Sequence, residues 1–333
     1  MKNYLILIRP YGMLFIGFTP VFSAIANGEF RFINLLILLI IGIFAHIFTF
    51  VQNDFYDVQV DRKSKYVSNR PIVQGTITQK IAFIIFVFSF IISLILTVLF
   101  IFFFYSIIVL LFAFLFITLY NKYSKRFFGM EYVLGLGVFS YGLFGAFSVS
   151  ENISYLALII SAMGFLQWLF SVGISANLKD VEFDSKLGIR TTPIAFGAHI
   201  SEKKLIIPVS FVLYAFVIKF VHIVIAMFAF IMGYTSIFVY NLPIPTICFL
   251  FISIILIYLT WKILTTPMAK RDKMLIFAGL QEGLSLLLIP IILMSSLIDN
   301  FGAVYTFLII LLLIFWPLFW FRLLYGKRMI PLE

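Results

Sequence analysis

The sequence predicts an all-α fold, a polytopic membrane helix bundle with nine or ten transmembrane helices. Of its 333 residues, 63% are hydrophobic and only 11% are charged, whereas soluble domains average about 45–50% apolar and about 25% charged residues. The mean hydropathy is +1.14. Strands are not expected, because lipid cannot satisfy the polar edges of an open sheet.

Ten apolar segments are long enough to cross a bilayer, which takes about 20 residues of helix. They lie at 11–28, 32–53, 80–102, 104–120, 131–150, 154–175, 204–228, 244–263, 275–297 and 302–325. One membrane-embedded domain covering 1–333 accounts for the length. The single cysteine, Cys248, excludes a disulfide framework and a cysteine metal cluster.

The positive charges indicate the orientation of these segments. If the N-terminus is cytoplasmic, every one of the 24 Lys and Arg except Arg31 and Lys219 lies in a cytoplasmic loop or terminus or at the adjoining end of a span. This asymmetry follows the positive-inside rule, so we expect a multi-pass cell-membrane protein with its acidic loops on the cytoplasmic side. The net charge of +10 then reflects orientation, and neither a nucleic-acid partner nor an obligate protein partner is indicated.

Two of the predicted cytoplasmic loops resemble each other. The first reads DVQVDRK from Asp57 and RPIVQG from Arg70, and the second reads DVEFDSK from Asp180 and RTTPIAFG from Arg190. Four predicted helices separate the two loops, so we predict two pseudo-repeated four-helix halves. The halves and the extra C-terminal helices are expected at about 5–125, 126–250 and 275–325.

The acids of each loop share one face if the chain there is helical. The two sets are Asn53, Asp57 and Asp61, spaced i, i+4, i+8, and Asn177, Asp180 and Asp184, spaced i, i+3, i+7. Clustered carboxylates at membrane depth are costly. They can lie in water, pair with bases or bind a divalent cation. Oxygen ligands without a His or Cys cluster favour a hard ion such as Mg²⁺.

Basic residues flank both acidic sets. They are Lys63, Lys65, Arg70, Lys179, Lys186 and Arg190. Alternating acids and bases suit a metal-bridged diphosphate, in which carboxylates hold the metal and bases hold phosphate oxygens. The alternative interpretation is that these loops are only solvated and that their bases are topology signals.

These motifs resemble those of the UbiA superfamily of intramembrane prenyltransferases. The resemblance rests on Asn53-Asp54-x2-Asp57-x3-Asp61, Asn69-Arg70-Pro71, Gly75 and Lys179-Asp180-x3-Asp184-x3-Gly188-x-Arg190-Thr191. It implies a helical bundle around a central cavity. It also implies Mg²⁺-dependent transfer of a polyprenyl group from its diphosphate to an acceptor.

The resemblance further implies a role for each site residue. Asn53, Asp57 and Asp61 would hold one Mg²⁺, and Asp180 and Asp184, with Asn177 beside them, the other, which makes the four aspartates catalytic. The diphosphate would be held by Lys65, Arg70, Lys179 and Arg190, and by Lys125 of the YNKYSKR segment. Asp54 points to another side of the helix and is expected to have a secondary or structural role. The spacing before Lys125 and the tenth span, 302–325, depart from the family pattern.

Two further residues have alternative interpretations. Tyr141, in the glycine-rich segment GLGVFSYG, is a candidate contact for the acceptor or for an allylic cation. Its alternative is close helix packing. His46 is expected to make a helix–helix hydrogen bond, with acceptor contact as the alternative.

The nature of the acceptor stays open. The eight residues between Asp61 and Arg70 favour an aromatic acceptor, similar to hydroxybenzoate or a quinone precursor. The alternative is prenyl transfer to a glycerol phosphate ether lipid, as in digeranylgeranylglyceryl phosphate synthase. A membrane transporter with inverted or parallel repeats is a rival of another class, but transporters place charges near the midplane, and here the acids gather at one membrane face.

Overall fold

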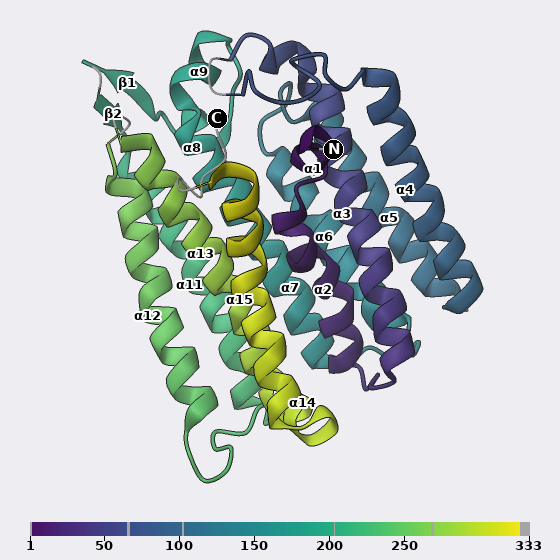
Figure 1. The fold of residues 1–333 in the computed structure, drawn as a ribbon. Helices are drawn as coiled ribbons and strands as arrows, with labels where there is room; N and C mark the ends of the chain where they lie inside the picture. The colour runs from purple at the N-terminus through teal and green to yellow at the C-terminus, as the bar shows by residue number, and fades with distance from the viewer. Residues whose placement is uncertain (1, 65–66, 102, 203, 268–269, 327–333) are drawn as a thin grey trace. The chain divides into compact units, whose positions relative to one another are not determined.

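The computed structural model describes residues 2–64, 67–101, 103–202, 204–267 and 270–326 (Figure 1). Ten helical segments of this described part are long and apolar enough to cross a membrane. The predicted all-α membrane bundle is therefore confirmed, with ten candidate spans, and the chain is a multi-pass membrane protein.

The helices are α1 (Lys2–Ile8), α2 (Pro10–Ala26), α3 (Phe32–Asp61), α4 (Gln79–Phe100), α5 (Phe104–Tyr123), α6 (Met130–Phe147), α7 (Tyr155–Phe170), α8 (Asn177–Lys179), α9 (Val181–Lys186), α10 (Thr192–Ala195), α11 (Val209–Ile231), α12 (Ile244–Thr265), α13 (Arg271–Ile292), α14 (Met294–Phe301) and α15 (Ala303–Tyr325), with a π-helical turn, η1 (Ser171–Ala176), between α7 and α8.

The chain divides into two compact units. Unit 1 comprises Met1–Lys122, Ser140–Ala157 and Leu311–Glu333, and unit 2 comprises Tyr123–Phe139 and Leu158–Ile310. The first acidic motif belongs to unit 1 and the second to unit 2. The internal repeat of four-helix halves stays a prediction.

Unit 1 brings helix backbones together at glycines. A Cβ atom on Gly42 of α3 would lie 2.5 Å from the Cα of Gly17 in α2, and one on Gly145 of α6 would clash with the carbonyl oxygen of Pro20. Small residues allow helices to pack closely where lipid supplies no hydrophobic driving force. α3 also packs along α4. The helix that carries the first motif is therefore fixed on two sides.

The first membrane segment of unit 1 is interrupted at Arg9. This residue has φ 48° and ψ 63°, a left-handed conformation that is uncommon for any residue other than glycine. The following Pro10 has no N–H to continue the helix. His46 Nε2 lies 3.0 Å from the carbonyl oxygens of both Ile8 and Arg9, and Trp316 Nε1 donates to that of Pro10 (2.6 Å). The predicted helix–helix hydrogen bond of His46 is confirmed.

The loop between α2 and α3 neutralises its own basic residue. The buried carboxylate of Glu29 accepts hydrogen bonds from Arg31 (Nη2 to Oε2, 2.7 Å) and from Asn34 Nδ2 (2.6 Å). Burial alone would raise the pKa of Glu29, but these donors outweigh it and lower the pKa to about 2. Glu29 is therefore ionised near neutral pH, and Arg31 carries its charge beside a permanent counter-charge.

Unit 2 has a continuous apolar core formed by α7, α11, α12 and α13. Phe170, Phe211, Ile263 and Met274 are among its buried members. The buried ammonium group of Lys219 has hydrogen-bond partners within this unit. Its Nζ donates to Gln167 Oε1 and to Ser285 Oγ, both at 3.0 Å. This network joins α7, α11 and α13.

A short β-hairpin precedes α11, contrary to the expectation that strands are absent. Strands β1 (His199–Ser201) and β2 (Lys204–Ile206) pair antiparallel, with His199 opposite Ile206. The predicted span 204–228 is accordingly wrong at its start, since α11 begins at Val209. The hairpin lies outside the candidate spans, where water can satisfy the strand edges, so the lipid argument does not apply to it.

Candidate functional site

The first motif occupies the last turns of α3. Asn53, Asp57 and Asp61 all belong to this uninterrupted 30-residue helix, so their predicted spacing on one face is confirmed. Asp57 and Asp61 are buried. The side chains thus lie at the end of an apolar helix rather than in an extended loop.

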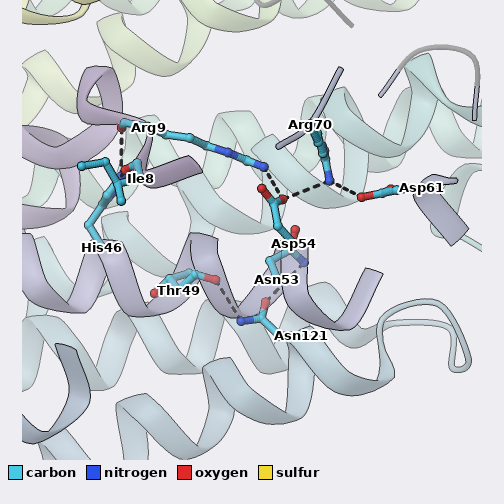
Figure 2. Close-up of polar contacts among 9 residues, drawn as sticks. All are labelled: Ile8, Arg9, His46, Thr49, Asn53, Asp54, Asp61, Arg70 and Asn121. Atoms are coloured by element: carbon cyan, nitrogen blue, oxygen red, sulfur yellow. Dashed lines mark hydrogen bonds and ion pairs between the residues drawn. The ribbon is translucent and has the colours of Figure 1, made fainter. Parts of the chain in front are cut away.

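Asn121 of α5 fixes the amide groups of this helix end. Its Nδ2 donates to the carbonyl oxygen of Thr49 (3.0 Å) and to Gln52 Oε1 (2.9 Å). Its Oδ1 then faces Asn53, whose Nδ2 donates to it at 3.4 Å (Figure 2). This arrangement leaves Oδ1 of Asn53 as the atom that could hold a cation.

Asp54 ties two arginines to the first motif. Its Oδ1 accepts from Arg9 Nη2 (2.5 Å) and from Arg70 Nη1 (3.1 Å), and the side chain is only 3% exposed. Arg70 Nη1 also donates to Asp61 Oδ2 (2.6 Å), as Figure 2 shows. Arg70, a predicted diphosphate residue, is therefore oriented by two carboxylates of α3, Asp54 and Asp61. Because one nitrogen of Arg70 reaches both, Asp54 lies on the same side of the helix as Asp61, and the expectation that it points to another side is wrong.

The second motif is not one continuous helix. The π-helical turn η1 precedes α8, and the backbone leaves the helix at Asp180 (φ −105°, ψ 5°) before α9 begins. Asn177, Asp180 and Asp184 therefore do not lie on one continuous helix, which the spacing argument assumed, and their common direction stays a prediction. π-Helical turns often occur at functional sites, and this one redirects the chain just before the acids.

Asp184 is the most unusual acid of the second motif. It is 1% exposed, and neither of its carboxylate oxygens has a hydrogen-bond partner among the described residues. Burial raises the pKa of Asp184 to about 6, while the nearby positive charge of Lys125 opposes the rise. A buried, uncompensated carboxylate is costly. The structure therefore places Lys125 within electrostatic reach of an acid whose carboxylate accepts no hydrogen bond from the described residues.

Asp180 lies in a different environment. It is 29% exposed, and its Oδ1 accepts from Arg271 Nη2 at 2.7 Å. Lys179 Nζ lies 3.7 Å from the other oxygen. Two cations of unit 2 thus surround this carboxylate, and one of them, Arg271, comes from the start of α13.

Glu131 of α6 supports the chain around the second motif. It is buried, and Thr192 Oγ1 donates to its Oε1. Gly173 of η1 packs against it, since a Cβ atom there would lie 3.0 Å from Glu131 Cγ. Glu131 thus connects η1 with the segment that follows Arg190.

The remaining predicted residues are dispersed. Arg190 is exposed, and Asn177 is partly exposed. Tyr141 of α6 belongs to unit 1, where its ring stacks on Phe144 (5.8 Å between centroids, 16° between planes) and its buried hydroxyl has no partner among the described residues. Lys65 lies outside the described residues.

Four residues near the motifs were not predicted as site residues. They are Arg9, Asp54, Glu131 and Arg271. Arg9 stands before Pro10 at the start of a membrane segment, and Arg271 stands in the basic run KRDK, so both are accounted for by the positive-inside rule. Their carboxylate partners are visible only in the structure, because Asp54 lies 45 residues from Arg9 in the sequence and Asp180 lies 91 residues from Arg271.

The donor set fits Mg²⁺ completed by a substrate. No group of three or more His, Cys, Asp or Glu among the described residues could hold an ion by itself. Magnesium, however, is usually bound through one or two carboxylates together with substrate phosphates and water. The orphaned oxygens of Asp184, next to the charge of Lys125, match this kind of site.

Sequence comparison finds relatives among prenyl-transferring enzymes. The family model of the UbiA prenyltransferase family matches residues 14–280. The chain is similar to the 4-hydroxybenzoate octaprenyltransferases of Neisseria gonorrhoeae (29% identity over 151 residues, 45% of this chain and 49% of that protein) and Legionella pneumophila (28% over 195 residues, 57% and 67%). It is also similar to the digeranylgeranylglyceryl phosphate synthase of Pyrococcus horikoshii (24% over 200 residues, 59% and 69%). The chain thus spans about half the length of the gonococcal relative.

Structure comparison finds the same fold in solved proteins. A UbiA homologue from Archaeoglobus fulgidus bound to GPP and Mg²⁺ has a TM-score of 0.60 at 18% identity, over 86% of this chain and 99% of that one. The apo structure of a UbiA homologue from Aeropyrum pernix has a TM-score of 0.64 at 14% identity, over 86% and 97%. At these identities the likeness shows the fold.

Proposed function

Because this chain belongs to the UbiA prenyltransferase family, whose model covers residues 14–280, we propose that it transfers a prenyl group from a prenyl diphosphate to an acceptor with Mg²⁺ as cofactor. The observation that carries the proposal is Asp184, a buried carboxylate with two oxygens that lack a hydrogen-bond partner among the described residues, beside the charge of Lys125. A cation completes such a carboxylate, and a base beside it suits the phosphate that the cation would bridge.

The acids and bases of both motifs have complementary roles in this proposal. Asn53, Asp57 and Asp61 hold one Mg²⁺, and Asp180 and Asp184, with Asn177, the other. When bound, the metal withdraws electron density from the diphosphate and stabilises it as a leaving group. The bases that neutralise the phosphate oxygens are Lys65, Arg70, Lys125, Lys179 and Arg190.

The reaction breaks the allylic C–O bond, and its electron pair leaves with the diphosphate. The prenyl carbon then bonds to the acceptor, which releases a proton. Apolar helices exclude the water that would capture the allylic cation. The buried ring of Tyr141 lies in unit 1, and an aromatic face can stabilise a cation by about 0.5–2 kcal/mol.

Two acceptor classes have support. The 4-hydroxybenzoate octaprenyltransferase relatives favour an aromatic acceptor, in agreement with the interval between Asp61 and Arg70. The Pyrococcus relative favours a glycerol phosphate ether lipid. We propose the aromatic acceptor first and the ether lipid as the alternative.

The test is prenyl transfer by the purified chain in detergent. Geranylgeranyl diphosphate and Mg²⁺ are supplied with either 4-hydroxybenzoate or geranylgeranylglyceryl phosphate, and products and released diphosphate are quantified by mass spectrometry. We expect one acceptor to be prenylated, with the activity lost on EDTA treatment and restored by Mg²⁺. No diphosphate release with either acceptor, or release unaffected by EDTA, would refute the proposal.

We also propose that the N-terminus and both acidic motifs face the cytoplasm. The Lys and Arg distribution supports this, as does the neutralisation of Arg31 by Glu29. In a variant with Cys248 replaced by serine, a cysteine introduced at exposed Gly28 should react with an impermeant maleimide in intact cells, whereas one at exposed Ser185 should not. The reverse labelling pattern would overturn this orientation.

A further inference from the structure

A small cavity of about 130 Å³ lies beside the first motif in unit 1. Its wall includes Lys2, Arg9, Tyr11, Asn69, Arg70 and Tyr325. These residues come from the interrupted first segment, from the loop after α3 and from the end of α15. The cavity is smaller than the roughly 300–1,000 Å³ of pockets for drug-sized ligands, so it suits a single ring or a phosphate group.

The charges around the cavity favour an anion. Lys2, Arg9 and Arg70 are cationic, and Asp54 is the carboxylate of the wall. Asp61 also pairs with Arg70. Three cations against two carboxylates leave an excess of one positive charge, and the amide of Asn69 and the phenol of Tyr11 add neutral hydrogen-bonding groups.

Arg9 is held in place but keeps donors available. Its side chain is only 17% exposed, and its single hydrogen bond among the described residues runs from Nη2 to Asp54. A guanidinium group has five N–H donors. Its backbone is in the left-handed region at φ 48°, a conformation that is retained where the surroundings enforce it and that often occurs at binding sites. His46, which contacts the carbonyl oxygens of Ile8 and Arg9, and Trp316, which donates to that of Pro10, provide that enforcement.

Leu324 and Tyr325 of the cavity wall come from α15, which lies beyond residues 14–280, the part of the chain that matches the family model. Tyr11 stacks on Phe321 (4.5 Å between centroids, 24° between planes) and meets Tyr325 edge-on (6.3 Å, 60°). Together with the bond from Trp316 to Pro10, these contacts seat the end of α15 over the interrupted segment. This helix therefore lies outside the region that the family model matches.

We propose that α15 makes this cavity a size-selective site for the anionic group of the acceptor, a carboxylate or a phosphate, which Arg9 binds and Tyr325 confines. The inference rests on the proposed function and deepens it, because it assigns the acceptor's charge to a defined site. A guanidinium binds either anion through charge-assisted hydrogen bonds. The aromatic rings of Tyr11 and Tyr325 limit the width of the acceptor next to its charged group.

The test measures acceptor binding without any transfer. The full chain in detergent, without Mg²⁺ or prenyl diphosphate, is titrated with 4-hydroxybenzoate, with glycerol 1-phosphate and with the neutral analogue 4-hydroxybenzamide. We expect one of the two anions to bind about tenfold or more tightly than the neutral analogue, because charge-assisted bonds to Arg9 are lost with the charge. The anion that binds distinguishes the aromatic acceptor from the ether lipid.

Variants separate binding from folding. Arg9→Gln should weaken the preferred anion about tenfold or more. Tyr325→Ala should improve the binding of the wider 6-hydroxy-2-naphthoate relative to 4-hydroxybenzoate by about tenfold, a change of selectivity that loss of stability cannot produce. Phe319→Ala on the same helix, with a 58% exposed side chain, is the matched control and should leave this selectivity unchanged.

Four results would overturn the inference. They are equal binding of the anion and the neutral analogue, no effect of Arg9→Gln, the same selectivity in Tyr325→Ala as in Phe319→Ala, and displacement of the bound anion by phosphatidylglycerol, which would make the cavity a lipid headgroup site. A chain that binds anions in this way but transfers no prenyl group would refute the proposed function alone. A chain that transfers prenyl groups without dependence on Arg9 or Tyr325 would refute this inference alone.

Discussion

Replacing Asp184 with asparagine is expected to abolish prenyl transfer and, at the same time, to stabilise the metal-free protein. The wild-type carboxylate is buried without a hydrogen-bond partner among the described residues, and a buried unsatisfied group costs about 1–3 kcal/mol, more if it is charged. An amide removes the charge but also removes the proposed metal ligand. Loss of the electrostatic stabilisation of the leaving group should lower kcat/KM by about 10³-fold.

Two measurements on the same variant check this expectation. Thermal unfolding in detergent with EDTA should give a higher Tm for Asp184→Asn than for wild type, and added Mg²⁺ with a diphosphate should raise the Tm of wild type more than that of Asp184→Asn. Asp299→Asn, at an exposed aspartate of α14, is the control and should match wild type in both respects. An active Asp184→Asn enzyme, or one that is destabilised in EDTA, would show that Asp184 has a structural role instead.

Replacing Asp54 with alanine is expected to cause the largest loss of stability among the charged residues of unit 1. Asp54 accepts from Arg9 and Arg70, whose side chains are mostly buried. Removing one partner of a buried ion pair leaves the other charge uncompensated and costs about 3–5 kcal/mol. Arg70 would keep its bond to Asp61 but lose the one to Asp54, so activity should also fall, by about 10²-fold.

The matched control for Asp54 is an exposed ion pair. Glu182 and Lys186 lie one helical turn apart with a 2.7 Å contact, and Lys186 is largely exposed, so Glu182→Ala should cost less than about 1 kcal/mol. Denaturant unfolding of both variants measures the difference. If Asp54→Ala costs no more than Glu182→Ala, the network of Arg9, Asp54 and Arg70 does not hold unit 1 together.

The membrane fold and the first motif could be predicted from the sequence because both depend on local patterns. Runs of apolar residues determine the spans. The spacing of Asn53, Asp57 and Asp61 places all three on one face once they lie on a single helix. The β-hairpin before α11 was missed because the argument against strands holds only inside lipid. Its residues lie beyond the end of the preceding span.

The surroundings of the second motif could not be predicted, because they depend on distant contacts. Nothing near Asp180 in the sequence identifies Arg271 as its partner, and the bond from Thr192 to Glu131 joins residues 61 positions apart. The interruption at Asp180 also has no proline or glycine signal beside it. The assigned roles of Tyr141, Arg190 and Lys65 stay predictions.

The π-helical turn η1 makes the direction of the second motif depend on the number of residues in Ser171–Ala176. Each residue of an α-helix turns the chain by about 100°, so loss of one residue from Ser171–Ala176 would leave the apolar segment intact but rotate the rest of the motif, starting at Asn177. A regular α-helix would make better hydrogen bonds there. Single-residue deletions in this stretch should therefore be selected against even where they improve local helix geometry. The second motif should tolerate substitutions in Ser171–Ala176 better than insertions or deletions there.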